Sequence, residues 1–110
     1  MFSIFTLHIK PNQFDMKSLQ EFIKSLQQNQ PENELSVQLK ALWYDGKGDW
    51  HQAHYQVDHL NDRSSAHVHA YLHRKEGDIW NADYWYNTAQ ESRPSISLSE
   101  EWEQLVLKFL

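Results

Sequence analysis

The chain has no cysteine among its 110 residues, which excludes a disulfide scaffold, a zinc site with thiolate ligands and a cysteine nucleophile. Only three glycines and three prolines are present, too few for the many tight turns of a sandwich of short strands. The formal net charge is −5 and there is no basic stripe, so nucleic acid is not an expected partner. No apolar run is long enough to span a membrane, and residues 1–10 make a poor signal peptide. We therefore expect a cytoplasmic protein without a membrane or nucleic-acid partner.

Aromatic residues are plentiful, with five tryptophans, five tyrosines and five phenylalanines. The chain length fits a single domain over residues 1–110 that closes one core. Apolar residues make up 40% of the chain, which is typical of a globular protein.

Apolar residues recur mostly at helical spacing, which predicts an all-α fold of antiparallel helix pairs joined by short turns. An N-terminal extension over 1–13 comes first, and within it residues 2–10 alternate as in an extended segment or edge strand. The predicted helices span about 15–28, 31–46, 49–61, 64–76, 78–89 and 97–110. We group them as a first helix pair over 15–46, helices with Gly-Asp turns over 49–90, and an amphipathic C-terminal helix over 97–110.

A repeat of 29 residues lies inside the chain. The matched positions are Ala41, Gly48, Asp49, Ala53 and Tyr55 in the first copy and Ala70, Gly77, Asp78, Ala82 and Tyr84 in the second. The alanines predict close helix packing, and each Gly-Asp pair predicts the end of one helix and the cap of the next.

These features resemble the tetratricopeptide repeat, whose signature has a Gly-Asp turn followed by an alanine, an aromatic residue, another alanine and a proline. In the second copy Ala82, Tyr86, Ala89 and Pro94 match these later positions. The resemblance implies stacked antiparallel helix pairs. The spacing is shorter than the usual ~34 residues, and His73 stands where the repeat has an aromatic residue before the turn.

Three segments, LKALWYDGKGDWHQAH, VHAYLHRKEGD and NADYWY, resemble a family of small uncharacterised bacterial proteins. This resemblance covers roughly residues 39–110 and implies a bacterial source. It implies no particular activity.

Histidines gather along the fourth predicted helix. At 100° per residue, His69, His73 and Glu76 share one sector beside a close-packed helix seam. His54 flanks the apolar stripe of the preceding helix, and Asn81 lies on the following one. If the helices stack as the repeat implies, these five residues converge at a seam lined by aromatic side chains.

Three interpretations of the histidines stay open. In the first, His54, His69, His73 and Glu76 bind a metal ion, since imidazole and carboxylate suit zinc or iron. In the second, His54 backed by Asp58 is a general base, and an arginine on the fourth helix holds an anionic substrate. In the third, which we favour from the sequence, the histidines are packing residues. No residue is identified as catalytic, and no cofactor is specified.

The aromatic run at 84–86 cannot face one core, because a helix spreads three successive residues over 200°. Tyr86 is the best core candidate. At least one of Trp80, Tyr84 and Trp85 must then reach the surface, a seam or a partner.

The sequence as a whole predicts a non-catalytic binding or adaptor module with an aromatic and His-rich groove for a protein segment or a small ligand. The alternative is a small metal-dependent or His-based enzyme built on the same residues. A third interpretation is a homodimer formed through residues 2–10 or exposed aromatics. The predicted contact residues are His54, His69, His73, Arg74, Trp80, Asn81, Tyr84 and Trp85.

Overall fold

The computed structural model describes residues 13–110. Across this part of the chain every regular element is a helix, and the fold is all-α as the sequence predicts. The helices are α1 (Gln13–Ser25), α2 (Val37–Gly46), α3 (Trp50–Val57), α4 (Arg63–Glu76), α5 (Ile79–Ala89) and α6 (Leu98–Phe109). The extended segment predicted over 2–10 lies outside the described residues.

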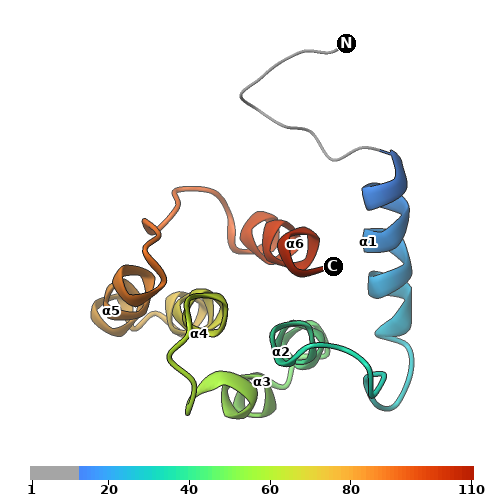
Figure 1. The fold of residues 1–110 in the computed structure, drawn as a ribbon, viewed down its shortest axis with the longest axis horizontal. Coiled ribbons are helices and arrows are strands. Elements are labelled where there is room, and N and C mark those ends of the chain that lie inside the picture. Colours follow the sequence, from blue (N-terminus) through green and yellow to red (C-terminus); the bar gives the residue numbers. More distant parts are fainter. Residues whose placement is uncertain (1–12) are drawn as a thin grey trace.

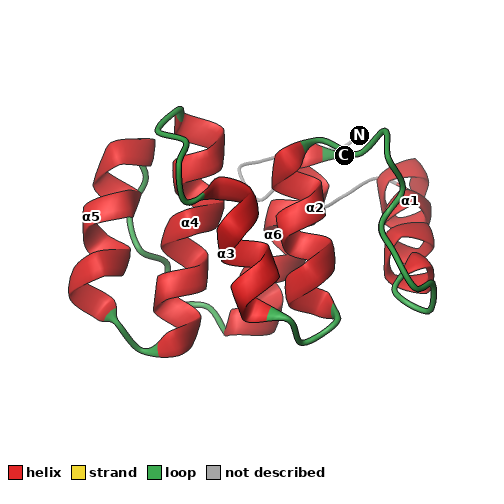
Figure 2. Ribbon diagram, turned by 90° about the horizontal axis from the view of Figure 1, so that it is seen from below, coloured by secondary structure: helices red, strands yellow, loops and turns green. Residues whose placement is uncertain are grey.

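Helices α1 to α5 form an arc, and α6 lies on its inner side (Figure 1). Helix α2 packs along α3, and α4 packs along α5, so each copy of the 29-residue repeat is one helix pair. The two pairs meet through contacts of α4 with α2 and α3. The view from below shows the same order of neighbours from α5 to α1 (Figure 2).

Helix α6 contacts α1, α2 and α4. The ring of Trp102 lies 5.9 Å from that of Phe22, and its indole N–H donates to the carbonyl of Leu42 at 2.9 Å. Helix α1 therefore packs mainly on α6 rather than along α2, although residues 15–46 were predicted to form a helix pair. Among the described residues, no helix combines the length and apolar character needed to cross a membrane.

The main core lies where these helices meet and is built from residues at most 8% exposed. Its members are Leu19, Phe22, Leu39, Ala41, Leu42, Trp43, Ala53, Val57, Val68, Tyr71, Leu72, Leu105 and Val106. A smaller cluster of Ala70, Ala82 and Tyr86 joins α4 to α5. The predicted small residues at both helix contacts are fully buried, which lets the backbones approach closely.

The two Gly-Asp turns have the same geometry. Gly48 and Gly77 have positive φ values of 85° and 88°, a conformation that glycine adopts without steric strain. Asp49 and Asp78 then cap α3 and α5 through their side chains. In both turns the aspartate N–H donates to the carbonyl five residues earlier, at 2.9 Å and 3.0 Å. This bond satisfies a carbonyl at the end of the preceding helix.

Some helix boundaries differ from those predicted. The second helix does not begin at Pro31 but at Val37, because the side chain of Ser36 accepts a hydrogen bond from the backbone of its first turn. Helix α3 ends at Val57 rather than near residue 61. Helix α4 begins at Arg63, one residue before the predicted start, because Asp62 is its cap. The last helix follows Ser97 as predicted, with a complete capping box.

Candidate metal centre

Three histidines from two helices come together at the junction of the two repeat copies. His54 lies on α3, and His69 and His73 lie one turn apart on α4. One ring nitrogen of each lies within 4.8 Å of those of the other two. The closest pair is Nε2 of His54 and Nε2 of His69, which are 3.0 Å apart. Of the five residues predicted to converge, the three histidines do so and Glu76 contacts His73, whereas Asn81 does not join them.

Burial favours the neutral form of His54 and His69. His69 and His73 are only 3% and 7% exposed. The pKa of His69 is lowered to about 4, first by burial and then by the neighbouring His54 and His73. The pKa of His54 is also lowered, by burial first and by His73 second. A neutral imidazole keeps the lone pair that a metal ion requires.

A carboxylate fixes the orientation of His73. Nδ1 of His73 lies 2.7 Å from Oε2 of Glu76, one turn further along α4. A carboxylate accepts from an imidazole N–H, so this contact places the proton on Nδ1 and leaves Nε2 with a free lone pair. Histidine ligands in metal sites commonly carry such an outer carboxylate.

The contact between His54 and Asp58 is weaker than the sequence suggests. Their Nδ1 and Oδ2 atoms are 3.7 Å apart, within ion-pair range but beyond hydrogen-bond distance. The other oxygen of Asp58 lies 3.2 Å from Nδ1 of His59. Asp58 thus lies beside two histidines, and a tight base dyad with His54 is not formed.

Two indole rings enclose the histidine cluster. Trp50 stacks on His54 at a centroid distance of 4.8 Å, and Trp85 stacks on His69 at 4.1 Å. The indole N–H of Trp50 donates to the carbonyl of Leu72 at 2.8 Å, which fixes the ring across the α3–α4 seam. The aromatic lining expected from the sequence is therefore formed, and Trp85 belongs to it.

The spacing of the ring nitrogens suits a small divalent ion. Zinc binds histidine nitrogen at about 2.0–2.1 Å in tetrahedral geometry, which places two ligand nitrogens about 3.4 Å apart. The closest pair of the cluster, at 3.0 Å, falls slightly short of this separation, and no pair of donor atoms exceeds 4.8 Å. A metal ion requires only small side-chain movements here.

The cluster does not satisfy its own hydrogen bonds. Nδ1 of His69 is buried and has no partner among the described residues. The Nε2 atoms of His69 and His54 satisfy each other through one N–H···N hydrogen bond, so the unpaired buried atom in the described part of the chain is Nδ1 of His69 alone. A buried histidine that serves only packing usually has its polar atoms paired, so this arrangement departs from the packing interpretation.

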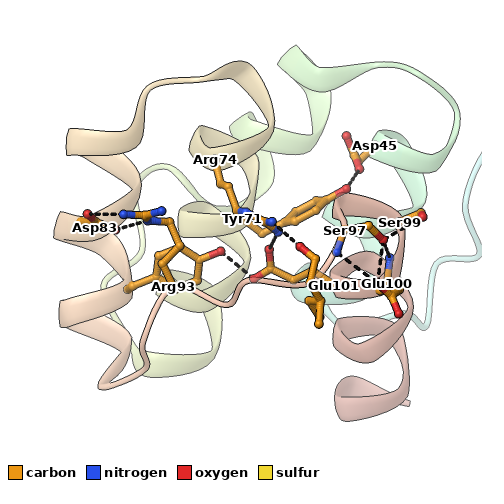
Figure 3. Close-up of polar contacts among 11 residues, drawn as sticks. Asp45, Tyr71, Arg74, Asp83, Arg93, Ser97, Ser99, Glu100 and Glu101 are labelled. Atoms are coloured by element: carbon orange, nitrogen blue, oxygen red, sulfur yellow. Dashed lines mark hydrogen bonds and ion pairs between the residues drawn. The ribbon is translucent and has the colours of Figure 1, made fainter.

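Arg74 does not face the cluster. Its guanidinium pairs with Glu101 of α6, with Nη1 and Oε1 2.7 Å apart, and also donates to the carbonyl of Ile96 (Figure 3). The other oxygen of Glu101 accepts from the hydroxyl of Tyr86 at 2.6 Å. Arg74 therefore holds α6 to α4 and is engaged inside the chain, whereas the sequence predicted a ligand contact.

The remaining predicted contact residues lie on α5 outside the cluster. Trp80 and Tyr84 are 80% and 56% exposed. The amide of Asn81 donates to the side chain of Asp78 at 3.4 Å, so Asn81 belongs to the helix cap. The structure thus gathers His54, His69, His73 and Trp85, and the exposed Tyr84 borders this group with its ring 5.2 Å from that of Trp85.

Sequence reasoning missed two residues that shape this region. Trp50 lies four residues before His54, a spacing that places two side chains on one helix face and signals the stacked pair. Glu101 lies in the first turn of α6, is 2% exposed and pairs with Arg74. No local signal distinguishes it from Glu100, which forms the capping box.

Comparison with protein-family models, with curated proteins and with solved structures found no match for this chain. Its function must therefore be inferred from the chemistry of its own residues.

Proposed function

We propose that this chain is a metal-binding helical protein in which His54, His69 and His73 hold one divalent late first-row transition ion, with zinc as the reference ion. The observation that carries the proposal is the convergence of three ring nitrogens within 4.8 Å across the α3–α4 seam. Imidazole is a preferred donor for zinc, copper, nickel and iron.

Three further features support the metal site. The pKa values of His54 and His69 are lowered, so both rings are neutral at pH 7. Glu76 accepts from Nδ1 of His73 and leaves its Nε2 for the ion. The stacked rings of Trp50 and Trp85 hold the imidazoles of His54 and His69 in position.

The test is calorimetric titration of Zn²⁺ into the full chain after chelator treatment. The matched variants are His54→Ala and His59→Ala, since both remove a histidine near the end of α3 and only His54 belongs to the cluster. His54 is partly exposed, with 26% of its side chain accessible, and the side chain of His59 is 66% exposed. Neither substitution empties the core, so both variants are expected to fold.

We expect one Zn²⁺ per chain for the wild type and for His59→Ala. We expect His54→Ala to bind Zn²⁺ more than about 100-fold more weakly. Removal of a carboxylate that only orients a ligand typically weakens metal binding by less than this. Equal affinity in the wild type and His54→Ala would refute the site. Equal loss in both variants would show adventitious binding to surface histidines.

A second candidate function is the non-catalytic capture of a protein segment, which the exposure of Trp80 and Tyr84 favours. Large exposed aromatics one helical turn apart combine apolar area with a polar tip, a frequent feature of interfaces. A partner identified by cross-linking from position 87, which is also exposed on α5, is to be purified and its affinity measured directly. We expect Trp80→Ser to abolish that affinity while Zn²⁺ binding is retained; unchanged affinity would refute this role.

Three statements stay predictions from the sequence: the tetratricopeptide-like character, the resemblance to small bacterial proteins and the cytoplasmic location. The stacked helix pairs and matching Gly-Asp turns support the first of these.

A further inference from the structure

The cluster offers three protein ligands and lacks a fourth. Within the described residues, the group of donor atoms that includes His54, His69 and His73 contains no additional histidine, aspartate or glutamate. Zinc in proteins is usually four-coordinate: structural sites fill all four positions from the chain, whereas catalytic sites leave one for solvent or substrate. The origin of the fourth ligand therefore decides the character of the site.

Glu76 is the nearest carboxylate, and it is already engaged. Its Oε2 lies 2.7 Å from Nδ1 of His73. Moving this carboxylate onto the metal would break its charge-assisted hydrogen bond with Nδ1 of His73. The His73 ring would then lose the contact that orients it. A second group of close donor atoms links His73, Glu76 and Asp78, but Asp78 accepts two hydrogen bonds from Asn81 as the cap of α5.

The other sides of the cluster provide no donor. Trp50 covers His54 and Trp85 covers His69 with stacked rings, and an indole is not a metal ligand. Nδ1 of His69 has no polar neighbour within hydrogen-bond distance among the described residues, so the protein provides no further metal ligand on that side of the cluster.

Solvent reaches the cluster beside His54 and Glu76. Their side chains are 26% and 38% exposed, whereas the His73 side chain is 8% exposed. The three ligands thus have a buried side formed by α4 and a side that faces water, where the carboxylates of Asp58 and Glu76 lie.

We infer that the metal held by His54, His69 and His73 has an open fourth position, filled by water and exchangeable for a small lone-pair donor from solution. This inference rests on the proposed metal site and assigns its ligand class. Such a site activates bound water or binds the donor atom of a substrate, unlike a closed structural site. Since carboxylates border the solvent side, neutral or protic donors are favoured over anions.

The test uses Co²⁺ in place of zinc, because tetrahedral Co²⁺ has a visible spectrum that reports its ligands. The full chain is freed of metal, loaded with one equivalent of Co²⁺ and titrated separately with imidazole and azide. Gel filtration after each titration measures the Co²⁺ retained, which distinguishes ligand exchange from removal of the ion.

We expect a saturable spectral change with imidazole, a weaker response to azide, and one equivalent of Co²⁺ retained throughout. A tetrahedral spectrum that neither reagent alters, with Co²⁺ retained, would overturn the open position while leaving the metal site intact. If Co²⁺ gives no bound spectrum and Zn²⁺ also fails to bind, the proposed function itself is refuted.

Glu76→Gln separates the open site from one that Glu76 closes. In our account this variant still shows the imidazole response, and its metal affinity falls by about 10–100-fold because His73 loses its orienting carboxylate. If Glu76 is the fourth ligand instead, the wild type is unresponsive to imidazole and Glu76→Gln becomes responsive. That pattern would contradict the inference.

Discussion

Helices α2 and α3, the first copy of the repeat, turn at the same place and in the same conformation as α4 and α5, the second copy. Gly48 and Gly77 both have φ near +87°, and Asp49 and Asp78 both cap the following helix. The side chains that precede the turn are different. Where the first copy has Lys40 and Tyr44, the second has His69 and His73.

This difference separates two roles in one motif. The glycine, the aspartate and the buried alanines define the backbone path, and they are the same in both copies. The helix face beside the turn is not constrained by that path, so it can carry different chemistry. The candidate metal centre forms where the second copy presents histidines to His54 of the first.

The largest expected effect concerns the charged residue before each turn, Asp45 in the first copy and Arg74 in the second. Arg74 pairs with Glu101, and the two side chains are 15% and 3% exposed. Asp45 pairs with Lys75, whose side chain is 38% exposed and can reach water. We expect Glu101→Gln to lower the free energy of unfolding by about 3–5 kcal/mol, since it leaves a buried charge unpaired.

For Asp45→Asn we expect a loss of only about 1–2 kcal/mol, because Lys75 is released to solvent and asparagine still accepts from Tyr71. Urea unfolding followed by tryptophan fluorescence measures both values. Equal losses, or the larger loss in Asp45→Asn, would contradict the assignment of Arg74 as the residue that holds α6.

The next effect is stabilisation by metal. Zn²⁺ at 100 times its dissociation constant should stabilise the wild type by about 2.7 kcal/mol, or about 10 °C in Tm for a domain of this size. His73→Tyr installs the residue that the first copy has at the equivalent position, Tyr44. Zn²⁺ should leave the Tm of this variant unchanged relative to its own metal-free value. An equal rise in both proteins would place the ion elsewhere.

A smaller effect concerns the pH dependence of stability and involves His67, whose counterpart in the first copy is Gln38. The pKa of His67 is lowered to about 4, first by burial and then by the ammonium of Lys108 beside it, while Glu91 opposes the shift. The unfolded chain therefore takes up a proton near pH 6.5 that the folded chain does not bind until about pH 4. The stability contributed by neutral His67 is complete above pH 6.5 and is lost as the pH falls towards 4.

We expect His67→Gln to reduce the loss of unfolding free energy between pH 7 and pH 4.5 by about 2 kcal/mol, allowing for partial exposure. His69 has a similarly lowered pKa and keeps its own share in both proteins. Urea titrations at the two pH values give the difference. Parallel pH dependence in wild type and variant would mean that His67 titrates normally in the folded chain.

The smallest effect tests the shared turn. A methyl group at Gly48 or Gly77 meets no heavy atom within 4 Å, so Gly48→Ala and Gly77→Ala differ from the wild type only in backbone preference. We expect each to lower the free energy of unfolding by about 1 kcal/mol. Thermal unfolding should show matched decreases in Tm; a clear inequality would show that the two turns are not equivalent.

Features fixed by neighbouring residues could be predicted from the sequence. Asp49 and Asp78 cap helices as expected because capping depends on residues within one turn. The start of α2 was misplaced because Pro31 and Ser36 are both acceptable helix starts, and only the folded chain shows that Ser36 is used.

Features that depend on packing could be predicted only where an arrangement of helices was assumed. The convergence of His54 with His69 followed from helical angles once two adjacent pairs were assumed. The position of α6 inside the arc could not be predicted from any local pattern, and this position is what pairs Arg74 with Glu101. Because the pairing was not foreseen, the sequence predicted a ligand contact for Arg74, which instead contacts another helix.

The most direct test of the metal centre is anomalous diffraction at the zinc edge from crystals of the full chain grown with one equivalent of Zn²⁺. We predict one strong peak between α3 and α4, bonded to His54, His69 and His73 at about 2.0–2.1 Å, with a solvent ligand in the fourth position. A peak only at other residues, or none in crystals where the three rings are ordered, would contradict this account.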